Sequence, residues 1–337
     1  MNLEEKFELV KRNTEEIVNE EELKSVLKKK SYSAYIGFAP TGRIHIGHLI
    51  PLGKIADFIK AGFSFKFLIA DLHAFLDDKK TPWEALDARS KYYEEVIKAV
   101  FKATGVSTSK VEFVKGSEFQ LKKDYVLDTL HLSGDITLNR SRRAASEVVR
   151  FKEDPKLGGF IYPIMQVLDP TYMGVDVCFS GIDQRGIYML GREVLPKLKS
   201  RTLTCVFTPL LPGLSGGKMS ASDAKNKIGI LDSEKEVVSK VNKAYCPAGE
   251  LKDNGVLAFV EHVIFPLKGK LRIERPKKYG GNLEFKSYEE LENSFVKGKV
   301  HPADLKQQLG KELNKVLEPV RKSLKGKEKI IEKAYPK

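Results

Sequence analysis

The spacing of apolar residues predicts short buried strands that alternate with amphipathic helices. Apolar and aromatic residues fill 33–38, and comparable runs follow at 65–70, 111–114 and 175–179. Over 45–61 the apolar residues instead recur at helical spacing. Strands that are apolar throughout and alternate with helices are typical of a parallel sheet covered on both faces. The pattern therefore predicts an α/β fold.

Further helices are predicted before and between these strands. Residues 4–30 have an amphipathic pattern that is interrupted near Asn19. Helical patterns also cover about 82–104 and 184–198. These segments extend the alternation of strand and helix along the chain.

The middle and the end of the chain depart from this alternation. The segment at about 121–161 is helical in pattern, and we interpret it as an insertion into the α/β domain. A loop rich in Gly, Ser and Lys follows at 213–227, and the sequence beyond it is mainly helical. We therefore expect two domains, 1–230 and a smaller helical domain at 231–337.

The charge of the chain favours polyanionic partners. Lys and Arg number 58 against 45 Asp and Glu, which gives a net charge of +13. Such an excess attracts RNA, although a solvated lysine-rich surface would account for it equally well.

Composition argues against membrane and disulfide-rich classes. A run of about eighteen apolar residues would be needed for a membrane helix, and none occurs. The charged N-terminus has no apolar segment behind it, so no secretory signal is expected. Cys178, Cys205 and Cys246 are scattered and form no CxxC pair, so neither a metal site nor a disulfide framework is expected. We expect a cytoplasmic protein.

Two histidines mark the start of the helix predicted over 45–61. His45 and His48 follow a strand and a Pro40-Thr41-Gly42 turn, and Gly47 between them lets a flat ligand approach the main chain. The N-terminus of a helix favours anions. This arrangement suits the stabilisation of charge on a phosphate under attack. Taken alone, the motif would be interpreted as two surface histidines.

A second candidate is the loop Leu214 to Ser222, which places Lys218 among glycines and serines. Such a loop can close over a triphosphate and offer positive charge to the leaving pyrophosphate. Taken alone, it would be interpreted as a linker.

Together these two segments resemble the HIGH and KMSKS motifs of the class I aminoacyl-tRNA synthetases. Gly181-Ile182-Asp183-Gln184 is similar to the GxDQ segment of the tyrosine and tryptophan members, and 162–169 is similar to the amino-acid-binding helix of the tyrosine enzymes. The resemblance covers about 5–323 and is closest to the archaeal and eukaryotic tyrosyl-tRNA synthetases. One departure is Ala221, which stands at the second lysine position of KMSKS.

The resemblance implies a fold and an activity. The fold is a Rossmann-like catalytic domain with a helical insertion, followed by an anticodon-binding domain. The activity is activation of L-tyrosine by ATP with Mg²⁺, without a tightly bound cofactor or a metal site on the protein. The aminoacyl group is then transferred to tRNA(Tyr). A homodimer is also implied.

The resemblance also assigns roles to individual residues. The catalytic residues are His45, His48 and Lys218. ATP would be bound by Gly37, Ala39, Gly47, Asp183, Met219, Ser220 and Ser222. Tyrosine would be bound by Tyr35, Leu68, His73, Gln120, Tyr162, Gln166, Asp169 and Gln184.

The helical spacing of Tyr162, Gln166 and Asp169 supports this assignment because it places them on one helix face. Asp169 and Tyr35 would receive the phenol of the substrate. A site that hydrogen-bonds a hydroxyl rejects an analogue without one, because buried polar groups then lose their partners.

Contacts with tRNA are expected on the insertion and on the C-terminal domain. The residues assigned to them are Arg140, Arg143, Tyr279, His301 and Asp304. The alternative for the insertion is an ordinary basic helix. For the C-terminal domain it is a tyrosine in a turn and an aspartate that caps the helix beginning at Leu305.

Three other functions fit parts of the pattern. Activation of tryptophan on the same fold does not explain Tyr35 and Asp169. A catalytically silent RNA-binding or signalling relative does not need His45, His48, Asp183 and Lys218 together. A nucleotidyltransferase for small metabolites does not explain the basic, helical C-terminal part.

Overall fold

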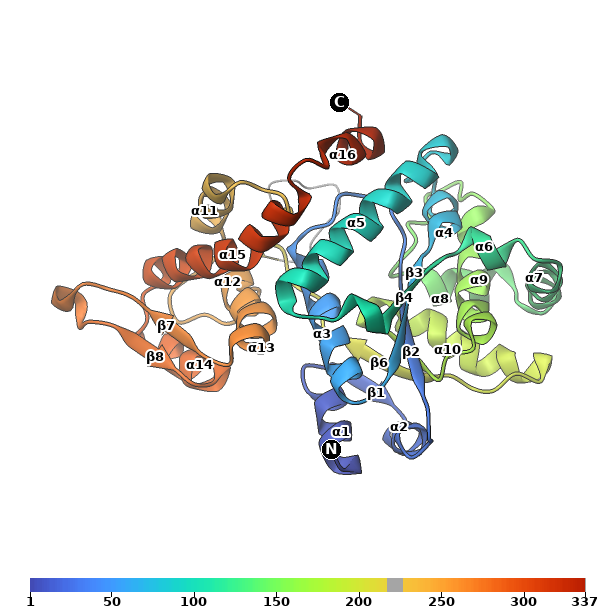
Figure 1. The fold of residues 1–337 in the computed structure, drawn as a ribbon, viewed down its shortest axis with the longest axis horizontal. Coiled ribbons are helices and arrows are strands. Elements are labelled where there is room, and N and C mark those ends of the chain that lie inside the picture. Colours follow the sequence, from blue (N-terminus) through green and yellow to red (C-terminus); the bar gives the residue numbers. More distant parts are fainter. Residues whose placement is uncertain (217–226, 337) are drawn as a thin grey trace.

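The computed structural model describes residues 1–216 and 227–336, and a six-stranded sheet forms the centre of this part (Figure 1). Its order is β1-β6-β5-β2-β3-β4. Neighbouring strands are parallel except at one edge, where β1 pairs antiparallel with β6. The predicted α/β fold with a parallel sheet is confirmed. The strands are β1 Glu16–Val18, β2 Ser33–Phe38, β3 Ser64–Ile69, β4 Val111–Lys115, β5 Val177–Gly181 and β6 Thr204–Thr208.

The strand order creates a crevice at the middle of the sheet. After β2 the chain adds β3 and β4 on one side, whereas β5 and β6 lie on the other. The helix after β2 packs on one face and the helix after β5 packs on the opposite face. Ligands of open α/β sheets bind where the direction of winding changes, beyond the carboxyl ends of the strands.

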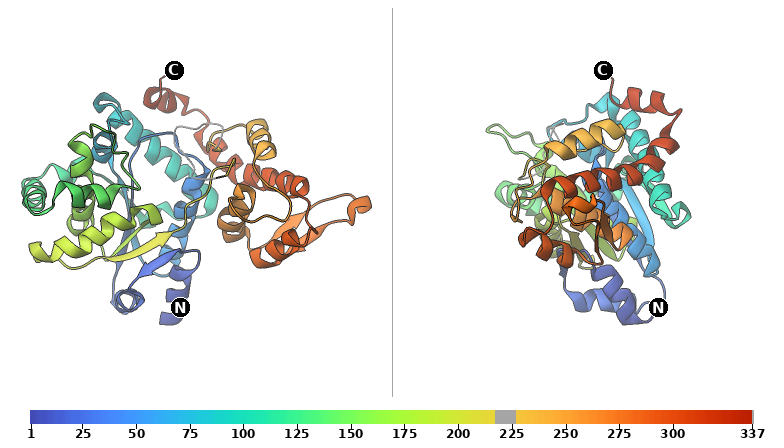
Figure 2. Two further views of the ribbon diagram at one scale, coloured as in Figure 1. Left: turned by 180° about the vertical axis from the view of Figure 1, so that it is seen from behind. Right: turned by 90° about the vertical axis from the view of Figure 1, so that its left-hand side faces the viewer.

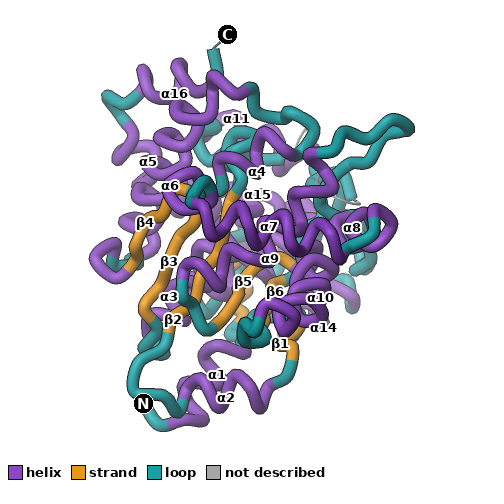
Figure 3. Tube along the Cα trace, turned by 90° about the vertical axis from the view of Figure 1, so that its right-hand side faces the viewer, coloured by secondary structure: helices purple, strands orange, loops and turns teal. Residues whose placement is uncertain are grey.

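Helices cover both faces of the sheet, and alternate residues of a strand serve the two cores. Ile36 packs with α3 Leu49–Lys60 and α5 Leu86–Thr104 on one face. Its neighbour Tyr35 packs with α9 Gly158–Met173 and α10 Arg185–Val194 on the other. Figure 3 shows α9 and α10 lying in front of the strands. Shorter helices complete this part: α1 Leu3–Lys11, α2 Glu20–Leu27, α4 Asp71–Leu76 and α6 Ser117–Gln120.

The segment between β4 and β5 is helical, as the pattern at 121–161 predicts. It contains α7 Lys123–Asp135 and α8 Leu138–Ala145, which pack against α9. A loop at 146–157 separates α8 from α9, so the segment is less continuous than its sequence suggests.

The C-terminal part is mainly helical and lies beside the sheet-bearing part (Figure 2). Its long helix, α15 Pro302–Leu324, packs against α5, and α16 Glu328–Ala334 also reaches α5. The remaining elements are α11 Glu234–Lys243, α12 Gly255–Phe259, α13 Phe265–Lys268, β7 Leu271–Ile273, β8 Leu283–Phe285 and α14 Tyr288–Val296.

Several elements differ from the sequence-based expectations. Residues 4–30 are not one interrupted helix, because β1 lies between α1 and α2. The strand expected at 175–179 begins at Val177, since Gly174 ends α9 with a positive φ and the Asp176 side chain accepts a hydrogen bond from the Ser33 amide. The strand β6 and the β7–β8 hairpin were not predicted from the sequence.

Two further findings concern membranes and metals. Within 1–216 and 227–336, no helix combines the length and apolar character that a membrane crossing requires. Among the same residues, no group of three or more His, Cys, Asp or Glu side chains is arranged to hold a metal ion.

Candidate active site

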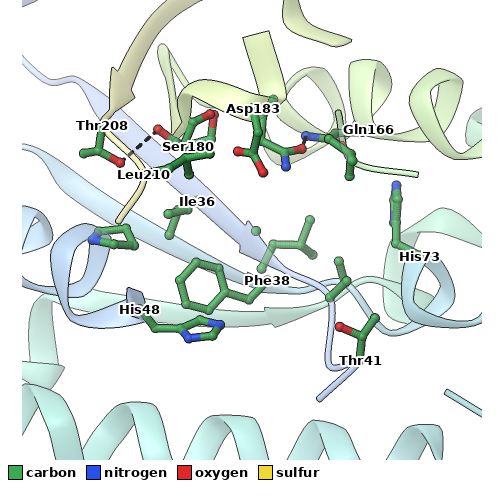
Figure 4. Close-up of a pocket in the computed structure, with 18 of the residues that line it drawn as sticks. Ile36, Phe38, Thr41, His48, His73, Gln166, Ser180, Asp183, Thr208 and Leu210 are labelled. Atoms are coloured by element: carbon green, nitrogen blue, oxygen red, sulfur yellow. Dashed lines mark hydrogen bonds between the residues drawn. The ribbon is translucent and has the colours of Figure 1, made fainter. Parts of the chain in front are cut away.

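A cavity of about 360 Å³ opens at the carboxyl ends of the central strands (Figure 4). The end of β2 contributes Gly37 and Phe38, and the end of β5 contributes Ser180 and Gly181. The 3₁₀ turn Ile46–His48 before α3 closes another side. The cavity therefore lies at the crevice that the strand order creates.

His45 and His48 form a close pair at one end of the cavity. Their ring centroids are 4.2 Å apart, and Nδ1 of His45 accepts a hydrogen bond from the Gly47 amide at 3.3 Å. Burial, with a smaller contribution from His48, lowers the pKa of His45 to about 2. Burial also lowers the pKa of His48 to about 4. Both imidazoles are therefore neutral near pH 7. His45 carries its proton on Nε2, because Nδ1 is an acceptor, so it offers an N–H donor rather than a charge.

The opposite end of the cavity is built around the carboxyl group of Asp169, which is 1% exposed. Its Oδ1 accepts hydrogen bonds from Gln120 Nε2 at 2.7 Å and from the Tyr125 hydroxyl at 2.8 Å. Burial raises the pKa of Asp169 to about 7, against the opposing effect of these two hydrogen bonds. The carboxyl group is thus poised between its neutral and ionised forms at physiological pH.

Two tyrosine hydroxyls line the same cavity. The hydroxyls of Tyr35 and Tyr188 are 2.7 Å apart, and both side chains are buried. Burial raises the pKa of each well above its ordinary value, so both are neutral donors and acceptors.

Three buried polar atoms near Asp169 have no hydrogen-bond partner within the described residues: His73 Nε2, Gln120 Oε1 and Gln166 Oε1. His73 Nε2 is 3.9 Å from Asp169 Oδ2. Burial lowers the pKa of His73 to about 4, so this imidazole is also neutral. Leaving such atoms unpaired costs free energy, about 1–3 kcal/mol for a neutral group. His73 and Gln166 line the cavity, and Gln120 contacts Asp169, which also lines it. The grouping of these unpaired atoms around Asp169 indicates a site for a polar ligand.

The third wall of the cavity carries Asp183 and Gln184, directly after β5. Gln166 Nε2 donates a 3.0 Å hydrogen bond to Gln184 Oε1, which ties α9 to this wall. A Cβ atom at Gly181 would lie 2.7 Å from Asp183 Oδ1 and 3.0 Å from Leu210 Cδ2. A glycine is therefore required for Asp183 to keep this position.

The structure brings most of the residues selected from the sequence into this one cavity. Gln120 does not line it but contacts Asp169, which does. Lys218, Met219, Ser220 and Ser222 lie outside the described residues. The selected residues that line the cavity are Tyr35, Gly37, Ala39, His45, Gly47, His48, Leu68, His73, Tyr162, Gln166, Asp169, Asp183 and Gln184.

The residues selected for tRNA lie on other surfaces. Arg140 of α8 pairs with Glu193 at 2.6 Å, and Arg143 is exposed on the same helix. Tyr279, between β7 and β8, is 60% exposed. The alternative in which Asp304 caps a helix at Leu305 is wrong. The helix begins at Pro302, and His301 caps it by accepting a hydrogen bond from the Ala303 amide.

Two tyrosines at the Asp169 end of the cavity, Tyr188 and Tyr125, were not selected from the sequence. Tyr188 lies four residues after Gln184 on α10, so helical spacing gave a signal for it. Tyr125 lies 44 residues from Asp169 along the chain, and no local pattern connects the two.

Comparison with known proteins agrees with this geometry. The family model described as tRNA synthetases class I (W and Y) matches residues 27–318. A tyrosine--tRNA ligase from Haloarcula marismortui is 48% identical, over 100% of this chain and 98% of the relative. The cytoplasmic tyrosine--tRNA ligase of Danio rerio is 44% identical over 98% of this chain, which spans 63% of that relative.

A solved structure of a tyrosyl-tRNA synthetase is also similar to this chain. The tyrosyl-tRNA synthetase from Archaeoglobus fulgidus, complexed with L-tyrosine, is 44% identical and superposes with a TM-score of 0.91. The match covers 96% of this chain and 100% of that one. The chain belongs to the tyrosine and tryptophan family of class I tRNA synthetases, among the tyrosine--tRNA ligases of archaeal and eukaryotic type.

Proposed function

We propose that this protein activates L-tyrosine with ATP and transfers it to tRNA(Tyr). The observation that carries the proposal is the buried Asp169 carboxyl, which faces the cavity beside the unpaired Nε2 of His73. A phenol hydroxyl can donate to a carboxylate oxygen and accept from an imidazole N–H. A phenylalanine ring would leave these buried groups without partners, and a tryptophan ring has no hydroxyl to offer.

The remaining tyrosine-binding roles follow from position. Tyr35 adds a hydroxyl at the phenol end, and Leu68 packs against the ring. Gln120 holds Asp169 through its 2.7 Å hydrogen bond, and His73 lies beside it. The substrate's α-amino group would be bound by Tyr162, Gln166 and Gln184, of which the last two are already hydrogen-bonded to each other.

ATP would occupy the opposite end of the cavity. Gly37, Ala39 and Gly47 leave room for its base and phosphates, and Asp183 would accept hydrogen bonds from the ribose. The N–H groups of His45 and His48 would stabilise charge that builds up on the α-phosphate, acting as neutral donors. Lys218, Met219, Ser220 and Ser222 keep their proposed ATP roles on the sequence motif alone. Mg²⁺ would arrive with the ATP phosphates as part of the substrate.

Two steps follow from this arrangement. The tyrosine carboxylate attacks the α-phosphorus, and pyrophosphate leaves with the electrons of the broken P–O bond. The 2′-hydroxyl of the terminal tRNA adenosine then attacks the carbonyl carbon of the adenylate, and AMP leaves. Neither step uses a protein nucleophile, so catalysis rests on positioning and electrostatic stabilisation.

We assign tRNA recognition to two surfaces outside the cavity. Arg140 and Arg143 would contact the acceptor end from the insertion. Tyr279 is exposed beside the ammonium group of Lys278, 4.9 Å from its ring centroid, which suits stacking on an unpaired base. His301 and Asp304 would contact neighbouring bases. The division into a catalytic domain, 1–230, and an anticodon-binding domain, 231–337, is part of this proposal, and so is a cytoplasmic location.

We also propose a homodimer formed through α7. Val126, Leu127 and Leu130 share a face of this helix and are exposed, Leu130 by 63%. Exposed Leu121 and Leu138 flank them at its two ends. A self-complementary contact between two copies would cover this apolar face. Light scattering tests it: wild type should give a dimer mass and Leu130→Glu a monomer mass.

The activation step is tested by ATP–pyrophosphate exchange with each of the twenty amino acids offered separately. Exchange with tyrosine alone is the expected result. Exchange with tryptophan alone would mean that the cavity does not recognise a phenol hydroxyl. Absence of exchange with every amino acid would favour a catalytically silent relative.

A further inference from the structure

The main chain of the loop 40–44, between β2 and His45, is held by hydrogen bonds from several other segments. Thr41 of this loop lines the cavity, and His45 follows it directly. Four of these hydrogen bonds are made by side chains outside the loop. Thr81 Oγ1 donates to the Pro40 carbonyl at 2.7 Å, and Arg89 Nη1 donates to the Thr41 carbonyl at 3.0 Å. The Tyr93 hydroxyl donates to the Gly42 carbonyl at 2.7 Å. The Ile44 amide donates to the Tyr92 hydroxyl at 3.2 Å.

Arg89 of α5 is the centre of this arrangement. Besides Thr41 O, its Nη1 lies 3.0 Å from Lys80 O and 2.9 Å from Thr81 Oγ1. Its Nε donates to Ala334 O at 3.2 Å. The guanidinium group therefore bridges the loop 40–44 and the last turn of α16, which lies far away in the sequence but beside α5 (Figure 1).

Tyr335, directly after α16, covers this guanidinium group. Its ring centroid is 4.6 Å from Arg89 Cζ and 5.5 Å from Arg43 Cζ, both within cation–π range. The same ring meets the ring of Tyr92 edge-on, with centroids 5.2 Å apart. Tyr335 thus contacts two of the side chains that hold the loop and one side chain of the loop itself.

The hydroxyl of Tyr335 plays no part in these contacts. Its oxygen is buried and has no hydrogen-bond partner within 1–216 and 227–336. The aromatic ring makes every contact described here, so replacing Tyr335 by Phe or by Ala separates the effect of the hydroxyl from the effect of the ring.

We propose that Tyr335 is a positioning residue for tyrosine activation, an inference that rests on the function proposed above. By fixing Arg89, Arg43 and Tyr92, the ring sets the main-chain path of 40–44. That path in turn sets Thr41 and His45 at the ATP end of the cavity. Asp169 belongs to α9, which packs on the opposite face of the sheet from Ile44, so we expect tyrosine binding not to depend on Tyr335.

Tyr335→Ala, Tyr335→Phe and wild type are compared in ATP–pyrophosphate exchange with tyrosine. The kcat/KM for ATP in Tyr335→Ala is expected to fall about three- to thirtyfold, in keeping with the loss of cation–π contacts at a partly buried site. Tyr335→Phe keeps the ring and should stay within about twofold of wild type. The dissociation constant for tyrosine, measured by calorimetry without ATP, should not change. Glu332→Ala, an exposed substitution on α16, is the matched control.

A second readout does not depend on activity. Amide hydrogen exchange at Ile44 should become faster in Tyr335→Ala and remain as in wild type in Tyr335→Phe and Glu332→Ala. If wild type exchanges no pyrophosphate with any amino acid, the proposed function fails. Hydrogen exchange at the Ile44 amide still tests whether the Tyr335 ring holds the loop 40–44. Unchanged kcat/KM and unchanged Ile44 exchange in Tyr335→Ala would overturn the proposal. The proposal would also be overturned if Tyr335→Ala weakened tyrosine binding as much as it lowered kcat/KM for ATP, or if Tyr335→Ala and Tyr335→Phe lowered kcat/KM equally.

Discussion

The hydroxyl of Tyr125 donates a 2.8 Å hydrogen bond to Oδ1 of Asp169, and this contact joins the helical insertion to the amino-acid end of the cavity. The same hydroxyl lies 2.7 Å from the Met165 carbonyl oxygen, so its single proton is shared between the two acceptors, and the second contact anchors the ring against α9. The insertion therefore does more than present an outer surface, because one of its side chains sets the carboxyl group that we propose reads the substrate.

Tyr125→Phe should weaken tyrosine binding. The substitution removes one of the two donors to Asp169 Oδ1, and hydrogen bonds to an ionisable group are worth about 1.5–3 kcal/mol. We expect the dissociation constant for tyrosine to rise about tenfold or more. Calorimetry measures it directly. Tyr172→Phe is the matched control, since its hydroxyl donates to Asp128 rather than Asp169; an equal effect of both variants would contradict the assignment.

Tyrosine binding should depend on pH around neutrality. Burial raises the pKa of Asp169 to about 7, so below that pH the carboxyl is protonated and accepts a weaker hydrogen bond from the phenol. Affinity should therefore increase from pH 6 to pH 8 in wild type and stay level in Asp169→Asn. His73, whose pKa burial lowers to about 4, does not titrate in this range. A flat wild-type profile would argue against an ionising Asp169.

The same raised pKa has a consequence for stability. The folded carboxyl keeps its proton to a higher pH than the unfolded one, whose pKa is near 4. Between about pH 4 and 7 the folded state thus binds more protons, and the free energy of unfolding falls as pH rises. Urea unfolding of wild type and Asp169→Asn at pH 5 and pH 7 checks this. The wild type should lose stability relative to the variant at the higher pH.

His48→Ala should slow activation without affecting tyrosine affinity. The imidazole lines the ATP end of the cavity and is neutral, so its loss removes a donor to the transition state. We expect kcat for pyrophosphate exchange to fall about a hundredfold. The dissociation constant for tyrosine should stay within about twofold, because hydrogen bonds and packing at the Asp169 end are kept. Equal losses in the two quantities would rule out this role.

Gly181→Ala should raise the KM for ATP. The added Cβ would lie 2.7 Å from Asp183 Oδ1, so the carboxylate must move away from the position proposed for the ribose. A tenfold increase, about 1.4 kcal/mol, is the expected size. Gly53→Ala is the control, because its nearest neighbour would be Leu267 Cδ2 at 4.0 Å. If the two variants have the same KM for ATP, Asp183 is not fixed by this contact.

Local patterns predicted the parts of the fold that depend on local spacing. The runs at 33–38 and 65–70 become β2 and β3, and the spacing over 45–61 becomes α3 after one 3₁₀ turn. In contrast, β1 is three residues long and exists because Glu16 pairs with Phe207, almost two hundred positions away. A strand that depends on such a distant partner has no signal of its own in the sequence.

The candidate site also has parts that local spacing predicted and parts that only the folded chain creates. Tyr162, Gln166 and Asp169 were grouped by helical spacing, and all three line the cavity. The depressed pKa values of His45 and His48 were not foreseen, because they arise from burial by segments that the motif does not include. Tyr125 and Tyr335 act across 44 and more than 240 positions, so only the folded chain brings them to the site.

The most direct test of the account is the ratio of kcat/KM for tyrosine to that for phenylalanine, in wild type and in Asp169→Asn. The variant keeps an oxygen for Gln120 and Tyr125 but turns an N–H group toward the phenol. We predict that wild type prefers tyrosine by about a hundredfold or more and that the variant loses at least about tenfold of this preference. The same ratio in both proteins would contradict the claim that Asp169 reads the phenol.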